Sequence, residues 1–183
     1  MQVVNKGLKV RLYPCEDMIG MFEQGMGNAR FVWNHILKTQ EYYNKLALSH
    51  GYPRMKCTLS NFNTILMMLK KEYSFLYLSE STSLQQVYRD LQSAFKHFFN
   101  DGYNYPKFKT KRNPKQSFRI QKVGNNVRVT NKRIRLAKIG FVHYQTSKEY
   151  RRLLKTSKIN NVTVKKENGK YYAIVNIKLM LMN

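Results

Sequence analysis

Apolar and polar residues alternate along residues 8–14, LKVRLYP, which predicts a half-buried β-strand that the final proline ends. Helical spacing of apolar residues follows, starting with two carboxylates at residues 16–17, where a first helical turn favours them. Gly25 and Gly27 are expected to break or kink this helix, because glycine is a poor helix former. A longer helix is then predicted from about residue 28 to residue 48.

Two further helices are predicted before residue 102. Residues 58–71 have helical spacing, with Thr58 or Ser60 as the candidate N-cap. The clearest helix covers residues 81–99, where apolar residues recur at steps of three and four. Its apolar stripe consists of Leu84, Val87, Tyr88, Leu91, Phe95, Phe98 and Phe99. Its opposite face is polar and partly basic, with Gln85, Arg89, Gln92, Ser93 and Lys96.

Short alternating segments predict strands in the rest of the chain. They cover residues 116–120, 126–130, 133–137 and 140–144. Residues 159–179 contain two more alternating runs around Asn168-Gly169, a strong signal for a type I′ hairpin. Residues 147–156 are expected to form a short helix or an ordered loop. One strand, four helices and about six strands favour an α+β fold, with the helices inserted into a small β-barrel or sheet.

Composition indicates a folded and strongly basic protein. Hydrophobic residues make up 43% of the 183 residues and aromatic residues 13%, which excludes a disordered basic tail. The formal net charge is +23, from 33 Lys and Arg residues against 10 Asp and Glu residues. Residues 1–101 have a net charge of +4, and residues 102–183 have one of +19. Such an imbalance causes self-repulsion, and a polyanion is the usual partner that offsets it.

Cysteine usage and hydropathy bear on the compartment. Cys15 and Cys57 form no CxxC pair and are too few for a disulfide framework, which fits a reducing compartment. The N-terminal residues lack the apolar core of a signal peptide, and no apolar run approaches the ~18 residues of a membrane span. These observations predict a soluble cytoplasmic protein without a membrane partner.

Residue types that carry catalysis or bind metals and cofactors are scattered along the chain. The four histidines have no cysteine or carboxylate at ligand spacing, and no His-hydrophobic-His pair occurs. Phosphate-binding loops of the GxxxxGK(S/T) and GxGxxG types are absent. Asp17, Asp90 and Asp101 are expected on separate helical positions, whereas a two-metal nuclease needs carboxylates that converge on its cations. We therefore expect no enzyme activity, metal, cofactor or small-molecule substrate for this chain.

Residues 105–120, YPKFKTKRNPKQSFRI, form a basic strip without a carboxylate. Its prolines disfavour a helix. An extended conformation would place Lys107, Lys109 and Lys111 on one side at intervals of ~6–7 Å, close to the spacing of nucleic-acid phosphates. Phe108 would lie on the other side and is expected to anchor the strip to the core. We interpret the lysine row as a phosphate-binding site.

Five segments, in this order along the chain, resemble a known family. They are KVRLYP at 9–14, NARFVWNHIL at 28–37, SLQQVYRDLQSAFKHFF at 83–99, GYNYPKFKTKRNPKQSFR at 102–119 and RIRLAKIGFV at 133–142. The series is similar to the N-terminal half of TnpB (OrfB), the accessory protein of a group of bacterial and archaeal insertion sequences. That family is related to the type V CRISPR effectors. The resemblance covers nearly the whole chain.

The resemblance implies a fold and a function. The fold is a small, OB-like β-barrel, the wedge domain, formed by residues 1–14 and 102–183 and split by a helical recognition domain at residues 15–101. The function is RNA-guided recognition of double-stranded DNA beside a short adjacent motif, with a guide RNA as the second partner. Cleavage in the family belongs to a RuvC-like domain with three carboxylates, followed by a zinc ribbon. This chain ends about where that domain is expected to begin. We therefore carry over binding and not cleavage, with a separate nuclease domain or chain as a further partner.

The resemblance also implies which residues contact nucleic acid. Arg30 and Asn34 match its RFVxNH signature. Gln85 lies in the LQ motif that contacts the DNA motif, and its amide suits base-edge readout because it both donates and accepts hydrogen bonds. Ser81 and Thr82 precede it and either join in or cap the helix. The basic wedge segment contributes Lys107, Lys109, Lys111, Arg112 and Arg119. The polar faces of the first strand and the fourth helix contribute Arg11, Arg89 and Lys96.

Two alternatives stay open beside this reading. One is a helix-turn-helix DNA-binding protein, because Gly25 and Gly27 would separate two short helices. The other is a non-specific or ribosome-associated RNA-binding protein, which a net charge of +23 and β-rich ends would also suit. The ordered motifs argue against the second alternative.

Overall fold

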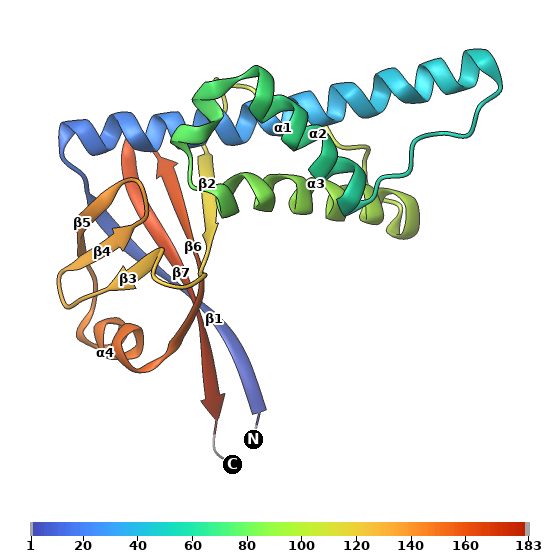
Figure 1. Cartoon of the computed structure of the whole chain (residues 1–183). Coiled ribbons are helices and arrows are strands. Elements are labelled where there is room, and N and C mark those ends of the chain that lie inside the picture. The colour runs from blue at the N-terminus through green and yellow to red at the C-terminus, as the bar shows by residue number, and fades with distance from the viewer. Residues whose placement is uncertain (1, 182–183) are drawn as a thin grey trace. The chain divides into compact units, whose positions relative to one another are not determined.

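The computed structural model describes residues 2–181 of the chain, which forms two compact units. The sheet unit joins the residues up to Met26 with those from Asn113 onward, and the helical unit comprises Gly27–Arg112. Figure 1 traces the chain from the N-terminal strand through the helices to the later strands. Helix α1 (Glu16–His50) contributes its first part to the sheet unit and the rest to the helical unit.

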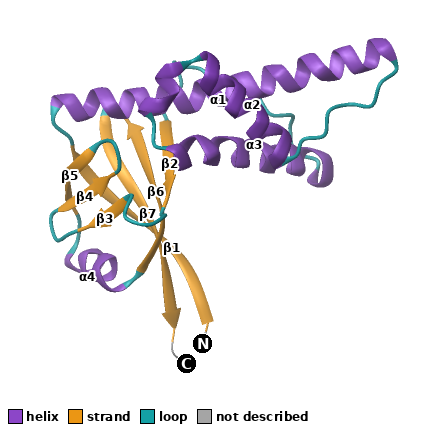
Figure 2. Ribbon diagram, in the orientation of Figure 1, coloured by secondary structure: helices purple, strands orange, loops and turns teal. Residues whose placement is uncertain are grey.

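The order of elements follows the hydrophobic pattern, with one strand, then helices, then six strands with a short helix among them (Figure 2). The helices after α1 are α2 (Leu59–Glu72), the 3-10 helix η1 (Ser74–Leu78), α3 (Ser81–Asp101) and α4 (Lys148–Thr156). The strands are β1 (Gln2–Tyr13), β2 (Gln116–Gln121), β3 (Val127–Val129), β4 (Arg133–Leu136), β5 (Gly140–Gln145), β6 (Lys158–Glu167) and β7 (Lys170–Leu181). Of the short helix and the ordered loop expected for residues 147–156, the structure shows the helix, α4.

All seven strands pair antiparallel in one sheet, in the order β2-β6-β7-β1-β5-β4-β3. The sheet curls into a half-barrel, which confirms the predicted α+β class. β1 lies between β7 and β5, and it pairs with β7 from Gln2↔Leu181 to Leu12↔Tyr171. The β6–β7 hairpin turns at Asn168 and Gly169, whose φ angles of 50° and 71° fit the predicted type I′ turn.

The buried face of the sheet is covered by the first part of α1. Phe22 is fully buried, and its ring centroid lies 6.3 Å from that of Phe118 and 5.5 Å from that of Tyr171. Beside it, Glu23 Oε1 accepts hydrogen bonds from Lys166 Nζ at 2.7 Å and from the Tyr171 hydroxyl at 2.6 Å. The hydrogen bond to Glu23 raises the pKa of Lys166. This group fixes α1 to β6 and β7 at the edge of the core.

α1 is continuous through Gly25 and Gly27, so the predicted break is wrong. At Gly25 the helix approaches the sheet closely. A Cβ atom there would lie 3.0 Å from two ring atoms of Phe118. Glycine at this position allows the helix to approach the sheet closely. Glycine within a helix costs about 1 kcal/mol of stability relative to alanine, and burial of the neighbouring Phe22 and Met26 offsets this cost.

The helical unit has its own core between the second part of α1, α2 and α3. The rings of Phe62 and Phe95 are almost fully buried, with centroids 6.0 Å apart. The predicted stripe of α3 is buried from Leu84 to Phe95. Phe98 is only half-buried and Phe99 is 65% exposed, so that stripe was predicted too long. The last turn of α3 instead lines a cavity, and the apolar spacing alone could not show this.

Helix ends in this unit follow local capping rules. Thr58, one of the two predicted caps, accepts a hydrogen bond from the Asn61 N–H at 3.2 Å and begins α2. α3 is capped by Glu80, whose carboxylate accepts from the Ser83 N–H at 3.1 Å. Gly102 ends α3 in the left-handed conformation, with φ 70°. Within residues 2–181, none of the helices has both the length and the apolar character needed to cross a membrane.

Replacing Gly25 or Gly27 with alanine is expected to have opposite effects on the free energy of unfolding. Gly27→Ala is expected to stabilise the fold by up to about 1 kcal/mol, because a Cβ there would meet only the Arg30 guanidinium at 3.8 Å. Gly25→Ala is expected to destabilise it by about 1–3 kcal/mol through overpacking against Phe118. Urea unfolding of both variants measures the difference. Equal or greater stability of Gly25→Ala would contradict the close approach.

Candidate nucleic-acid interface

Residues 105–112, which we call the lysine segment, contain no helix or strand and are held by two side chains of α1. Trp33 Nε1 donates a hydrogen bond to the Lys107 carbonyl at 2.9 Å. Asn34 Nδ2 donates to the Lys109 carbonyl at 2.9 Å, and Asn34 Oδ1 accepts from the Lys109 N–H at 2.8 Å. The Asn34 carboxamide thus forms hydrogen bonds with both backbone groups of Lys109, as a residue of a neighbouring β-strand would. α1 thereby fixes both the position and the direction of the segment.

The three lysines predicted to form one row have different surroundings. Lys109 Nζ lies 3.8 Å from the centroid of the Trp33 ring, a cation–π contact. The residue as a whole is exposed, but burial of its ammonium lowers the pKa of Lys109, and the Asp90 carboxylate opposes part of that shift. Lys107 and Lys111 are exposed, and their ammonium groups form no hydrogen bond or ion pair with any residue that the structure describes. The segment therefore offers two open ammonium groups and one that is partly desolvated.

Phe108 does not anchor the lysine segment, contrary to the prediction. Its ring is 48% exposed, whereas Pro106 is buried. The anchoring comes from backbone groups that Trp33 and Asn34 hold. Because these contacts join residues more than seventy positions apart, residue spacing within the segment could not reveal them. Arg112 is exposed in the turn that ends the segment.

The start of α3 holds the residues expected to read DNA. Gln85 is half-buried on the polar side of the first turns, and Ser81 is exposed. The Thr82 hydroxyl donates a hydrogen bond to the Glu80 carboxylate, the group that caps the helix. Thr82 therefore supports the cap, one of the two roles considered for it. Farther along, Arg89 and Lys96 are exposed, while Arg30 is half-buried on α1.

The sheet unit has a second candidate surface on the side opposite its buried face, which we call the outer sheet face. Cross-strand pairing places Arg11 of β1, Tyr172 of β7 and Lys165 of β6 in one row. Tyr13 and Arg133 both pair with His143 of β5 and extend the same face. Its cations are Lys9, Arg11, Arg119, Arg128, Arg133, Arg135, Lys158, Lys165, Lys170 and Lys178.

Aromatic rings separate the cations of the outer sheet face. The Arg11 guanidinium lies 5.1 Å from the Tyr172 ring centroid and 5.4 Å from that of Tyr13. Lys9 Nζ lies 4.3 Å from the Tyr172 centroid on the same face. Glu167 accepts hydrogen bonds from Lys9 at 2.7 Å and Lys165 at 3.2 Å, and the bond from Lys9 is the main cause of its lowered pKa. Interleaved cations and rings suit phosphates and unpaired bases together.

Sequence reasoning named Arg11 and Arg119 on this face and missed several of their neighbours. The alternation of β1 did place Lys9 and Tyr13 beside Arg11. Tyr172 and Arg133 could not be added, because strand register across distant segments decides which side chains share a row. The charge excess is carried by both units, with 20 basic and 5 acidic residues in the sheet unit and 13 and 5 in the helical unit.

Carboxylates, histidines and cysteines do not gather in the described part of the chain. No three of them within residues 2–181 lie close enough to hold a metal ion. The His97 ring and Asp101 form a pair at 2.6 Å at the exposed end of α3. The chemistry of the two candidate surfaces is therefore that of cations, amides and aromatic rings.

Comparison with known proteins gives three matches. Residues 1–46 match the family model of the OrfB/IS605 helix-turn-helix domain; the described part of that span forms β1 and most of the continuous α1. InsQ of Escherichia coli K12, named as a candidate RNA-guided DNA endonuclease, is 32% identical over 168 residues, covering 91% of this chain and 39% of InsQ. A protein of Streptomyces pristinaespiralis with the same kind of name is 29% identical over 121 residues, covering 64% of this chain and 28% of that relative. The chain thus spans well under half the length of these relatives.

Asn34→Ala is expected to loosen the lysine segment without unfolding the protein. It removes two exposed hydrogen bonds that each contribute about 0.5–1.5 kcal/mol. Local opening, and with it tryptic cleavage at Lys107, Lys109 and Lys111, should then rise about tenfold. Quantitative mass spectrometry of the early peptides measures this rise. Asn63→Ala, at an exposed position of α2, serves as the control. Unchanged cleavage in Asn34→Ala would show that the pair does not hold the segment.

Proposed function

Because this chain belongs to the TnpB/OrfB family of insertion-sequence proteins, as its ordered motifs predicted, we propose that it binds nucleic acid for that system. Its partners in this proposal are a guide-type RNA and the double-stranded DNA beside a short adjacent motif, in the cytoplasm of a bacterium or archaeon. The observation that carries the proposal is the outer sheet face, which combines ten cations and the rings of Tyr13, Phe141 and Tyr172 with one carboxylate of the described strands, Glu167.

The outer sheet face favours RNA as its ligand. Arginine beside Tyr172 and Tyr13 can bind phosphate while the rings offer stacking surfaces to unpaired bases. Nη1 of Arg11 is buried and has no hydrogen-bond acceptor in the described part of the chain. A phosphate oxygen would satisfy that donor. These features support assigning the guide RNA to the sheet unit.

The start of α3 is the proposed site for the DNA motif. The half-buried Gln85 carries a carboxamide that can both donate to and accept from a base edge. Arg89, one turn later and exposed, would neutralise a phosphate beside it. Arg30, Ser81 and Lys96 remain proposed contacts. Asn34 is proposed to act indirectly, by holding the lysine segment.

Cleavage is assigned in this proposal to carboxylates of a separate domain or chain. The three aspartates of this chain lie on different turns: Asp17 begins α1, Asp90 lies within α3, and Asp101 ends α3 and pairs with His97. The helix-turn-helix alternative loses one argument, since α1 has no break at Gly25 or Gly27. A non-specific polyanion-binding protein is the alternative that the binding experiment must separate.

Affinity for RNA from the transposon end is expected to exceed affinity for a scrambled RNA of equal length, and the preference should survive about 0.2 M salt. Neutralising Lys107 and Lys111 together should make the slope of log affinity against log salt shallower by about 1.4–1.8, because each removes one phosphate contact. Lys109→Gln is expected to change that slope by less than half of the change per lysine in the double variant, because the Lys109 ammonium already contacts the Trp33 ring. Fluorescence anisotropy across a salt series measures all three slopes.

The matched control neutralises Lys38 and Lys45, two exposed lysines of α1. An equal slope change in the control would mean that any surface lysine contributes, and equal binding of both RNAs would leave a non-specific binder.

A further inference from the structure

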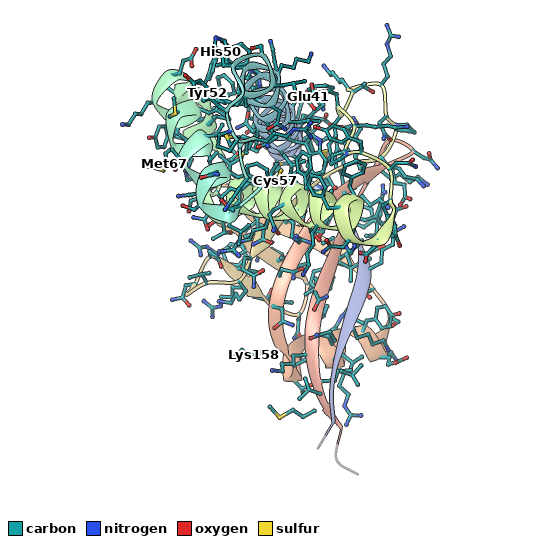
Figure 3. The ribbon with its side chains drawn as sticks, turned by 90° about the vertical axis from the view of Figure 1, so that its right-hand side faces the viewer. Glu41, His50, Tyr52, Cys57, Met67 and Lys158 are labelled. Carbon is teal, nitrogen blue, oxygen red and sulfur yellow. The ribbon has the colours of Figure 1, made fainter. Side chains whose placement is uncertain are left out.

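A cavity of about 620 Å³ lies within the helical unit, between α1, the last turns of α3 and the loop of residues 51–58. Figure 3 shows Cys57 of this loop beside α3. The volume is in the range of sites that bind small molecules or single building blocks of polymers. None of the residues that line it is acidic.

The wall of the cavity is aromatic. Phe95, Phe98, Phe99 and Tyr105 all belong to its lining. The Tyr105 ring meets Phe98 edge-on, with centroids 5.2 Å apart, and Phe99 lies nearly parallel to Phe95 at 6.2 Å. Phe99 is 65% exposed, so one large flat surface at the cavity faces solvent. A planar ligand would remove that apolar surface from water.

The cavity has cationic side chains at its rim and an amide side chain in its interior. Arg54, Lys56 and Lys96 at the rim are exposed and form no ion pair within the described residues. Inside, Gln40 donates a hydrogen bond to the Met55 carbonyl at 2.6 Å. Its other amide atom, Oε1, is buried and accepts no hydrogen bond from any described residue. An N–H group of a ligand would satisfy this acceptor.

Aromatic wall, cationic rim and amide interior together match one chemical class. We propose that the cavity binds an unpaired nucleotide of a single-stranded nucleic acid, with its base against Phe99 and Tyr105 and its phosphate at Arg54, Lys56 and Lys96. The proposal deepens the proposed function and rests on it, because it gives the bound strand a defined point of attachment. Bases turned out of a strand are commonly held in this way, by stacking and by hydrogen bonds to their edges.

Affinity measurements with single-stranded RNA and DNA of about 12 nucleotides test this site. Phe99→Ala is expected to lower the affinity about tenfold for the strand that occupies the cavity. Tyr42→Ala is the matched control, since Tyr42 is 61% exposed in the same unit and outside the lining. A loss with RNA, with DNA or with both supports the proposal and names the source of the nucleotide. Unchanged affinity for both strands overturns it, whereas a wild-type chain that binds neither strand contradicts the proposed function itself.

Alkylation of Cys57 gives a second readout that does not depend on a variant. Burial raises the pKa of the Cys57 thiol to about 11, so the reactive thiolate is scarce at about pH 8. The rate of reaction with iodoacetamide should rise about tenfold per pH unit below that pKa. Saturating single-stranded RNA or DNA is expected to slow Cys57 alkylation several-fold, while the exposed Cys15 keeps its rate. Mass spectrometry of the alkylated peptides measures both rates. Equal rates of Cys57 alkylation with and without the bound strand would overturn the proposal.

Discussion

The pairing of β1 with β7 is the constraint on which the rest of the structure depends. These strands lie at opposite ends of the described chain, yet they pair along almost their whole length. Closing so long a loop costs conformational entropy, and the long ladder together with the buried sides of both strands offsets it. Once the ladder has formed, the segment between Met26 and Asn113 can only be an insertion that leaves the sheet unit and returns to it.

Charge sets the second constraint, because a net charge of +23 opposes compact folding. The few carboxylates are used where they fix a junction: Glu23 binds Lys166 and Tyr171, and Glu167 lies between Lys9 and Lys165. Arg11 and Arg133 of the outer sheet face have aromatic rings beside them in place of carboxylates. They stay available to a polyanion, so binding and stability are expected to rise together when the ligand is present.

Aromatic side chains position the cations that carboxylates do not. Trp33 holds the lysine segment through its N–H and faces the Lys109 ammonium with its ring. Tyr172 has Lys9 and Arg11 beside its ring. Both arrangements restrict long, flexible side chains before a ligand arrives, which lowers the entropy lost on binding. Phe99 is a further aromatic side chain, and its ring is exposed beside the cavity of the helical unit.

Local sequence determined the elements, the Asn168-Gly169 turn, the Thr58 cap and the basic character of the surface, because these follow from periodicity, backbone preference and charge within a few residues. Five ordered motifs also determined the family. Tertiary structure alone decided that α1 runs unbroken past Gly25, that Asn34 pairs with Lys109, and that Phe99 borders a cavity. It also decided which cations share the outer sheet face. In each case the partner lies far along the chain, and only strand register and helix packing bring the two together.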